Sequence, residues 1–520
     1  MENLIVGSGP SAAGAALALC ADESQSVTVV DIGERLEDDA RSAVARLAGQ
    51  DAAGWSARDV ETISEQPVRV GAGRIPQKRA YGSDFAFRDR GQQDGVLLPT
   101  GGNTAPVSGA LGGFSNVWGA QAMPFSRSTF DSWPVSWTDI EPHYRAVLAE
   151  VPLAAEEDDY AEEFPLLGPS GPLPPVSART GRVLDRYARH REAIRRAGVV
   201  VGKARIALAS APCVRCGLCM TGCPYGLIYS ASHTFERLIR AGRIRYLSDM
   251  LVTRVRGGDR PAVTGVELAT GSPFSLSADR VLVGAGAIGT SRIVLSSMDN
   301  PPAAVPLQES MQFLVPFVSA TSTGDPRRNP GGDFTLNQFN MLVEFDHRAY
   351  TTSQIHCYPY NPAIAGALPA PLRAKVMDRA AGELLGRLTA GFGYLPSWEA
   401  PQLTLRLERG RGDRLAEVSV QVRTAEKPLL RKVLARLAQV APRLDLYPVL
   451  PMVTPSGPAK SYHFGSTFPH GQGSDLLGRV DGLPGVHLID GAVLPSVPST
   501  TFTLTVMANA HRIASEALRA

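Results

Sequence analysis

Four of the six cysteines fall within eleven residues, as Cys213-x-x-Cys216-x-x-Cys219-x-x-x-Cys223 followed by proline. Bacterial ferredoxins use this spacing to ligate iron–sulfur clusters through cysteine thiolates. In two-cluster ferredoxins the fourth cysteine serves the other cluster, so a single cluster here needs Cys223 to fold back, or a distant ligand such as Cys357. Four thiolates also suit a tetrahedral zinc site, and free thiols or an occasional disulfide need no metal at all. The run therefore predicts one [4Fe-4S] cluster, a zinc ion or a metal-free loop, and its spacing favours a cluster over zinc.

A second chemical motif is the glycine pattern Gly7-x-Gly9-x-x-Ala12 near the N-terminus. Gly7 permits a tight turn, Gly9 lets a pyrophosphate approach the backbone, and the small Ala12 allows a helix to pack closely on a strand. Asp31 follows at about the spacing at which an acidic side chain accepts hydrogen bonds from an adenosine ribose. We expect a strand at residues 4–6, a helix at 13–21 and a strand at 26–30. The combination predicts a dinucleotide site, for FAD or NAD, rather than an ordinary βαβ turn.

Four further segments resemble those of the glucose–methanol–choline (GMC) oxidoreductases, and they stand in that family's order. They are Leu111–Gly119 (LGGFSNVWG), Val283–Leu295 (VGAGAIGTSRIVL), Ser461–Gly471 (SYHFGSTFPHG) and Val486–Ile513 (VHLIDGAVLPSVPSTTFTLTVMANAHRI). The segment Trp133–Val135, followed by residues 139–147, is similar to the pyranose-oxidising branch in particular. The resemblance spans nearly the whole chain, and it implies a flavoprotein that binds FAD.

The resemblance also implies which residues contact the flavin. In the family, the segment that Leu111–Gly119 resembles lies along the flavin. Asp490 and Gly491 would place backbone groups beside the ribityl chain and pyrophosphate, although Asp-Gly is also a common strand-end turn. Val117 stands about where the pyranose-oxidising branch carries the histidine joined covalently to FAD, so we expect noncovalent FAD. The expected cofactor-binding residues are Gly7, Gly9, Ala12, Asp31, Gly112, Gly113, Ser115, Asn116, Gly119, Asp490 and Gly491.

Oxidation of an alcohol by a flavin needs a hydride acceptor and a base for the hydroxyl proton, and a neutral histidine suits the second role. By resemblance His463 is that base, with hydride passing to flavin N5; the alternative is a histidine that only satisfies loop backbone groups. The family usually carries a second His or an Asn where this chain has Thr501, whose hydroxyl can hydrogen-bond substrate but cannot act as a base near pH 7. His470 is left without an assigned role, and His511 is expected to pack or cap.

These expectations describe an FAD-dependent alcohol dehydrogenase or oxidase that acts on a sugar-like or cyclic small metabolite. The electron acceptor is left open among oxygen, a quinone and a protein carrier; a cluster would favour a dehydrogenase, because electrons could then leave singly. The threonine at position 501 motivates an alternative, a non-redox lyase or isomerase that keeps FAD as a scaffold. A third alternative is a flavo-iron–sulfur electron-transfer protein that processes no substrate itself.

The resemblance implies a fold of class α/β plus α+β that positions these groups, in which a Rossmann-like FAD-binding domain carries an inserted substrate domain built on an antiparallel sheet. By the resemblance, the FAD-binding domain is discontinuous and comprises residues 1–124, 205–299 and 459–520. A connecting or lid segment occupies 125–204, and the substrate-binding domain occupies 300–458. Alternating apolar and polar residues predict a hairpin at 247–268 and half-buried strands at 334–358 and 402–422, with a helix at 370–388.

The composition excludes several other classes of function. The 520 residues include 52 Lys+Arg and 50 Asp+Glu, a formal net charge of +2, so we expect no nucleic-acid partner. The 51 glycines and 40 prolines indicate many tight turns and disfavour an all-helical architecture. Glycines and a proline interrupt the apolar stretch at 4–21, so we expect neither a signal peptide nor a membrane span, and a cytoplasmic location. In that reducing compartment the cysteines should start reduced.

Overall fold

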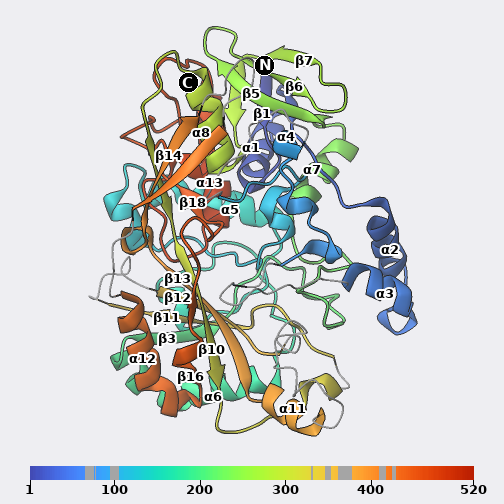
Figure 1. Ribbon diagram of the computed structural model, residues 1–520, viewed down its shortest axis with the longest axis vertical. Coiled ribbons are helices and arrows are strands. Elements are labelled where there is room, and N and C mark those ends of the chain that lie inside the picture. The colour runs from blue at the N-terminus through green and yellow to red at the C-terminus, as the bar shows by residue number, and fades with distance from the viewer. Residues whose placement is uncertain are drawn as a thin grey trace.

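The computed structural model describes residues 1–64, 75, 78–93, 105–329, 332–345, 353–360, 378–408, 417–423 and 429–519. Figure 1 shows an elongated molecule with two lobes: the upper lobe contains both chain termini, and the lower lobe contains the largest sheet. Within the described ranges, no helix combines the length and apolar character needed to cross a bilayer.

The upper lobe is built on a five-stranded sheet with strand order β19-β8-β1-β2-β4. All neighbouring strands are parallel, and the central ones are buried on both faces, which explains their nearly continuous apolar sequences. The strands come from all three segments expected for the FAD-binding domain. Their bounds are β1 (Glu2–Val6), β2 (Ser26–Val30), β4 (Arg245–Leu247), β8 (Arg280–Val283) and β19 (Val486–Leu488). The strands predicted at 4–6 and 26–30 are therefore confirmed.

Helix α1 (Pro10–Cys20) confirms the helix predicted after the glycine turn, and it packs against α13 (Thr503–Ala517). The two backbones lie very close: a Cβ added at Gly14 would come within 2.2 Å of the Met507 carbonyl oxygen, so this crossing requires glycine. Further helices of this lobe are α5 (Trp137–Glu150), α7 (Ala231–Arg240) and α8 (Gly286–Ser297).

A three-stranded antiparallel sheet forms the top of the upper lobe, as Figure 1 shows. It consists of β5 (Met250–Arg256), β6 (Ala262–Glu267) and β7 (Pro273–Ser277). Strands β5 and β6 pair around the turn at 257–259. The hairpin predicted at 247–268 is therefore confirmed.

The lower lobe is built on a seven-stranded sheet of order β16-β10-β13-β12-β11-β3, with β17 also paired to β10; all its pairs are antiparallel. Its strands are β3 (Val199–Lys203), β10 (Met311–Val318), β11 (Phe339–Val343), β12 (Ser353–Tyr358), β13 (Leu388–Leu395), β16 (Tyr447–Pro448) and β17 (Thr454–Pro455). Strand β3 comes from the segment expected to be a connection. Apolar side chains of α6 (Ala178–Arg196) and α12 (Leu429–Leu444) share a core with this sheet.

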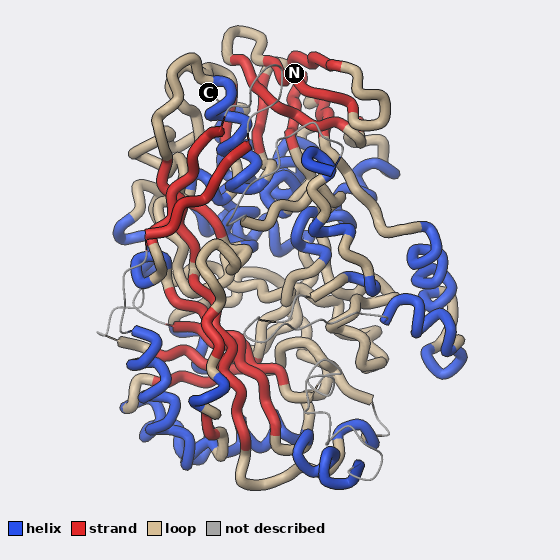
Figure 2. The backbone as a smooth tube through the Cα atoms, in the orientation of Figure 1, coloured by secondary structure: helices blue, strands red, loops and turns tan. Residues whose placement is uncertain are grey.

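A four-stranded sheet of order β15-β14-β9-β18 links the two lobes, and Figure 2 shows its strands running from the upper lobe toward the lower one. It contains β9 (Val305–Glu309), β14 (Gln402–Glu408), β15 (Glu417–Arg423) and β18 (Phe464–Gly465). Strand β9 pairs with β18 immediately after His463, so the chain before β10 and the chain around His463 are held together.

The strands predicted at 334–358 and 402–422 are confirmed by β11, β12, β14 and β15, while residues 346–352 and 409–416 lie outside the described residues. The expectation of half-burial is wrong for β11 and β12, because every residue of these two strands is buried. Of the helix predicted at 370–388, residues 370–377 lie outside the described residues, and α11 (Asp378–Leu385) confirms the next part. The prediction extends too far at its end, because Leu388 already begins β13. The remaining helices are α2 (Asp38–Ala48), α3 (Ala57–Ser64) and the short α4 (Arg90–Gln93).

Candidate functional site

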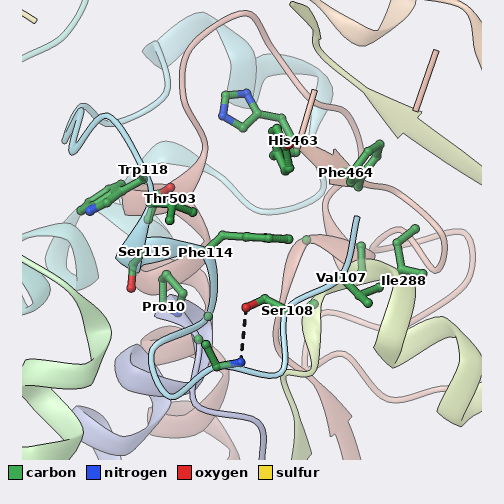
Figure 3. Close-up of a pocket in the computed structure, with 18 of the residues that line it drawn as sticks. Pro10, Val107, Ser108, Phe114, Ser115, Trp118, Ile288, His463, Phe464 and Thr503 are labelled. Carbon is green, nitrogen blue, oxygen red and sulfur yellow. Dashed lines mark hydrogen bonds between the residues drawn. The ribbon is translucent and has the colours of Figure 1, made fainter. Parts of the chain in front are cut away.

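A cavity of about 860 Å³ extends from the upper lobe to the seven-stranded sheet. Ligand pockets commonly measure roughly 300–1,000 Å³, so this one can hold a large ligand. Gly9 and Asp31 line it in the upper lobe, and His463 also lines it. In Figure 3, Pro10 at the start of α1 and His463 lie on opposite sides of Phe114. The fold therefore brings the N-terminal motif and the predicted base into one cavity.

The turn between β1 and α1 presents its backbone to this cavity. Gly7 has φ +94°, and a Cβ there would lie 2.5 Å from the Gly284 carbonyl oxygen. A Cβ added at Gly9 would meet no atom within 4 Å, because Gly9 faces the cavity. Helix α1 starts with no side-chain cap, so its first N–H groups and positive dipole end suit a phosphate. Ala12 is fully buried inside the lobe, where it packs and does not line the cavity.

The carboxyl group of Asp31 lies at the end of β2, where it lines the cavity. Ser8 Oγ donates a hydrogen bond to it, and the Tyr246 hydroxyl donates another at 2.9 Å. Burial raises the pKa of Asp31 to about 6, against the lowering effect of these hydrogen bonds. Above that pH the group is an anchored carboxylate, which can accept hydrogen bonds from a ribose.

The predicted flavin segment at 111–119 divides into residues that face the cavity and residues that shape the loop. Gly113, Ser115 and Gly119 line the cavity. Gly112 does not; it has φ +89°, its N–H donates to Ser8 Oγ at 3.0 Å, and an added Cβ would lie 2.8 Å from a backbone nitrogen. Asn116 does not line it either, because its amide donates to two carbonyl groups of its own loop at 2.9 and 2.7 Å.

Asp490 and Gly491 follow β19 and both line the cavity. The Asp490 carboxyl accepts hydrogen bonds from the Thr290 hydroxyl at 2.5 Å and from the Ala492 N–H at 2.9 Å. Burial raises the pKa of Asp490 to about 6. The side chain thus ties the end of β19 to helix α8, whose N-terminus also borders the cavity and has no side-chain cap.

His463 is enclosed by aromatic and hydroxyl side chains. Its Nδ1 lies 2.9 Å from Ser310 Oγ. Its ring stacks on the Tyr394 ring with 4.9 Å between the ring centroids, and the Phe502 ring meets it edge-on with 5.1 Å between the centroids. Burial lowers the pKa of His463 to about 4, so the imidazole is neutral near pH 7. Glu309 fixes the preceding loop by accepting hydrogen bonds from the Ala459 N–H and the Ser461 hydroxyl, at 2.8 and 2.9 Å.

Thr501 also lines the cavity, and its hydroxyl lies 3.4 Å from the Gln121 carbonyl oxygen. His470 lies outside the cavity: its Nδ1 is 2.6 Å from the Asp475 carbonyl oxygen and its Nε2 is 3.2 Å from the Asn509 amide. His511 also lies outside it and pairs with another imidazole, with 2.8 Å between the two Nδ1 atoms. The structure therefore brings His463 and Thr501 together and keeps the other two histidines away from them.

Sequence reasoning missed the wall of the cavity that the seven-stranded sheet supplies. The side chains concerned are Gln312 on β10, His356 and Tyr358 on β12, and Phe392 and Tyr394 on β13. Burial lowers the pKa of His356 to about 3, and its Nε2 lies 3.1 Å from Gln354 Oε1. Strand alternation could have predicted that these residues share a face, but not that the face borders a cavity.

The four cysteines of the 213–223 run line a second, small cavity, and Cys357 does not. The chain thus folds Cys223 back toward the other three. All are free thiols, and burial raises the pKa of Cys216 to about 12. In the part of the chain that the structure describes, no group of three or more His, Cys, Asp or Glu side chains is arranged to hold a metal ion. Neither the [4Fe-4S] cluster that the spacing predicted nor the zinc site that it allowed is therefore supported.

The residues of the large cavity fit FAD. Two uncapped helix N-termini, the open backbone at Gly9 and the buried Asp31 provide sites for phosphates and a ribose. Segment 107–119 and His463 border the rest of the cavity, where space remains for the ring system. Val117 lines this space, and its side chain has no atom that could form the covalent histidyl link.

Comparisons with known proteins agree with this fit. An uncharacterized GMC-type oxidoreductase of Rhodococcus erythropolis is 23% identical over 433 residues, which cover 78% of this chain and 81% of that protein. Two solved structures, pyridoxine 4-oxidase from Mesorbium loti and a fungal aryl-alcohol oxidase, each match with a TM-score of 0.60 at 14% identity. The first match covers 100% of this chain and 99% of that chain, and the second covers 99% of both. No family model matches the chain.

The sequence relative is named as a GMC-type oxidoreductase, and both solved structures are of GMC family members. The predicted fold class, a mixed α/β fold with parallel and antiparallel sheets, is confirmed by these structures. The comparisons support an oxidoreductase, and GMC oxidoreductases generally bind FAD. The likeness to the pyranose-oxidising branch stays a prediction, whereas the resemblance to the GMC family is confirmed: this chain has the fold of the GMC oxidoreductases over its whole length and is related in sequence to one of them.

Proposed function

We propose that this chain is an FAD-dependent oxidoreductase that oxidises the alcohol group of a small cyclic metabolite, with FAD bound noncovalently. One observation carries the proposal: the uncapped helix turn at Gly9 and the buried, neutral imidazole of His463 border the same 860 Å³ cavity. The first is suited to a dinucleotide phosphate and the second to a hydroxyl proton. The general class agrees with the relatives described above.

Bound FAD would supply the hydride acceptor. The role of His463 is to take the hydroxyl proton, and its neutral state near pH 7 leaves one ring nitrogen free of a proton. When the Nδ1–H group of His463 donates a hydrogen bond to Ser310 Oγ, the proton is on Nδ1. Nε2 then carries the free lone pair and is the nitrogen available to substrate. Thr501 offers one hydrogen bond to the same substrate oxygen, and the aromatic side chains Tyr394 and Phe502 keep water from the base.

The cavity wall favours a ring-bearing alcohol over a sugar. Two glutamine side chains of the wall are already bonded to protein groups: Gln312 donates to the Tyr394 hydroxyl at 3.2 Å, and Gln121 donates to two asparagine side chains at 2.9 and 2.7 Å. A buried sugar would need partners for several hydroxyl groups, and unpaired ones are costly. A planar ring needs mainly aromatic contact, which Tyr358 and Phe392 offer. The names of the two structural relatives, which specify pyridoxine and aryl alcohols, agree with this choice.

The experiment is a turnover assay of the purified full chain with a one-electron dye as acceptor. Benzyl-type and pyridine-methanol alcohols are compared with glucose and other pyranoses, and products are identified by mass. We expect ring-bearing alcohols to yield carbonyl products that have lost two hydrogens. A product of unchanged mass would instead identify the isomerase alternative, and an elimination product the lyase alternative. Preferential oxidation of pyranoses would overturn the assignment of substrate class.

A further inference from the structure

The sheet wall of the large cavity contains a second buried imidazole besides that of His463. His356 lies on β12, between Asn340 of β11 and Phe392 of β13. It is 2% exposed and lines the cavity. Its ring centroid lies 5.1 Å from that of Tyr394, whose ring also stacks on His463. The two imidazoles therefore contact the same tyrosine ring and border the same cavity.

A hydrogen bond on one side of the His356 ring decides which nitrogen carries the proton. Nε2 lies 3.1 Å from Gln354 Oε1, an atom that can only accept. The orientation of this amide is set in turn, because Gln354 Nε2 lies 3.7 Å from Met123 Sδ, a weak acceptor. A reversed amide would place its oxygen against the sulfur, with no hydrogen between two acceptors. The Nε2–H group of His356 therefore donates to Gln354, and Nδ1 carries a lone pair.

The lone pair on Nδ1 has no hydrogen-bond partner in the part of the chain that the structure describes. The neighbouring Asn340 amide does not supply one: its Oδ1 accepts from Gln121 at 2.7 Å, and its Nδ2 has no partner. Burial, with a smaller contribution from the nearby His463, lowers the pKa of His356 to about 3. The ring is therefore neutral near pH 7, and Nδ1 remains an acceptor. A buried acceptor without a partner is costly, so a ligand that donates to it gains binding energy.

A second polar group of β12 is also left unused by the described residues. Tyr358 follows His356 by two positions, so the two side chains lie on the same face of the strand, and both line the cavity. No hydrogen bond within the described ranges engages the Tyr358 hydroxyl. Burial raises the pKa of this phenol, so it keeps its proton. Strand β12 therefore contributes one acceptor and one hydroxyl group to the cavity wall that remain for a ligand.

We propose that His356 recognises a second polar group of the substrate: its Nδ1 accepts a hydrogen bond from a hydroxyl group on the substrate's ring, separate from the alcohol that is oxidised. The substrate class is thereby narrowed to hydroxylated aromatic alcohols. This inference rests on the function proposed above, because it takes the substrate to be a ring-bearing alcohol that is oxidised beside His463. A ring hydroxyl supplies the hydrogen that Nδ1 lacks, whereas the ether oxygen of a methoxy group would meet the lone pair with no hydrogen between them.

The hydroxyl subsite also agrees with the choice of an aromatic ring over a sugar. A single ring hydroxyl finds a partner in His356, and Tyr358 and Phe392 cover the ring. A site built to bind a substrate hydroxyl discriminates against analogues that lack it, because its buried polar group is then left unpaired. The expected discrimination in kcat/KM is roughly tenfold, the effect of one neutral hydrogen bond.

The test compares kcat/KM of the full, FAD-loaded chain for benzyl alcohol, its ortho, meta and para hydroxy derivatives, and the corresponding methoxy ethers. The wild type should prefer at least one hydroxy isomer over both benzyl alcohol and the matching ether, by roughly tenfold. His356→Phe keeps a flat ring without an acceptor, so the ratio should fall to about one. Cys357→Ala is the matched control, because Cys357 lies on the opposite face of β12 in the core with α6 and α12, and it should keep the preference.

His356→Gln provides a second variant, because its amide oxygen can also accept a hydrogen bond. It should retain part of the preference, which distinguishes loss of the acceptor from loss of the ring, and it replaces His356→Phe if that variant fails to fold. The inference is overturned if the wild type prefers no hydroxy isomer, or if His356→Phe keeps the wild-type preference.

Titration of the same compounds by ligand-observed nuclear magnetic resonance separates this inference from the proposed function, because it measures binding without turnover. Hydroxyl-dependent binding that is lost in His356→Phe, with no oxidation of any ring-bearing alcohol, would support the subsite and contradict the proposed function. Oxidation of ring-bearing alcohols with no preference for a hydroxyl group would support the proposed function and overturn the subsite.

Discussion

The two ends of the large cavity are built in different ways. In the upper lobe, the cavity is bordered by backbone: the glycine turn after β1 and the N-termini of α1 and α8. Around His463, it is bordered by side chains from β10, β12 and β13 and from the loops before β18 and α13. The first end needs short local segments with little side chain, and the second needs side chains from five separate parts of the chain.

Substitutions should therefore have different effects at the two ends of the cavity. At the backbone end, a side chain added at Gly9 occupies ligand space, so substitution there should affect cofactor binding and leave the fold intact. At the side-chain end the groups are separately supplied, so each substitution should change the rate of chemistry and leave the cofactor bound. The four predictions below test this contrast, beginning with the largest effect.

Gly9→Val should abolish FAD binding. Its Cβ would meet no protein atom within 4 Å, so the added side chain extends into the cavity at the start of α1 and excludes a phosphate. The measurement is flavin content per chain after purification, with circular dichroism to check folding. Gly181→Val in α6 is the control, because an added Cβ there is equally free of contacts and no residue of α6 lines the cavity. A Gly9→Val protein with full flavin content would show that the phosphates bind elsewhere.

His463→Ala should slow anaerobic flavin reduction by about 10²–10⁴-fold, the usual contribution of a general base, with FAD content unchanged. His470→Ala is the control, because His470 is also buried but lies outside the cavity, and its rate constant should stay near that of the wild type. A larger loss in His470→Ala than in His463→Ala would mean that another group accepts the proton.

Thr501→Ala should slow the same step by roughly tenfold. The variant removes one neutral hydrogen bond to the substrate oxygen, which is worth about 0.5–1.5 kcal/mol. Stopped-flow measurement of flavin reduction gives the rate constant, and Thr501→Ser should recover most of it because the hydroxyl is retained. An effect as large as that of His463→Ala would assign Thr501 a more central part in proton transfer.

Ser310→Ala should have the smallest effect, roughly threefold, because Ser310 acts through His463 and the ring contacts of Tyr394 and Phe502 remain. Ser310 is a positioning residue that acts through its hydroxyl. Ser310→Thr retains the hydroxyl and should keep the wild-type rate of flavin reduction, whereas Ser310→Ala lacks it and should not. The pH profile provides a second readout. Burial lowers the pKa of His463 to about 4, so the wild-type rate should stay level as pH falls through about 6.5 and drop only as the imidazole becomes protonated.

The same contrast explains how much of the site the sequence could reveal. The turn at Gly7 and Gly9 and the acid at Asp31 lie within one βαβ unit, so their spacing alone predicts their meeting. Within the 111–119 segment, however, Gly112 and Asn116 shape the loop and do not line the cavity. A motif locates a segment, but local backbone conformation decides which of its side chains face the ligand.

The sheet wall could not be predicted because it depends on long-range pairing. Gln312 and Tyr394 are opposite one another through the pairing of β10 with β13, and His356 joins them only through β12. Sequence alternation predicts the strands of this sheet and is silent on their neighbours. For the cysteine run, the spacing left open whether Cys223 or the distant Cys357 would join the other three thiols, and the structure places Cys223 with them.

The most direct test of the central claim is a single anaerobic turnover of the wild-type chain with an excess of a ring-bearing alcohol. We predict that the oxidised flavin absorbance is bleached and that one carbonyl product forms for each FAD reduced, because the base and the cofactor site border one cavity. A chain that converts its substrate while its FAD stays oxidised, or that purifies folded without FAD and binds none when it is added, would contradict the account.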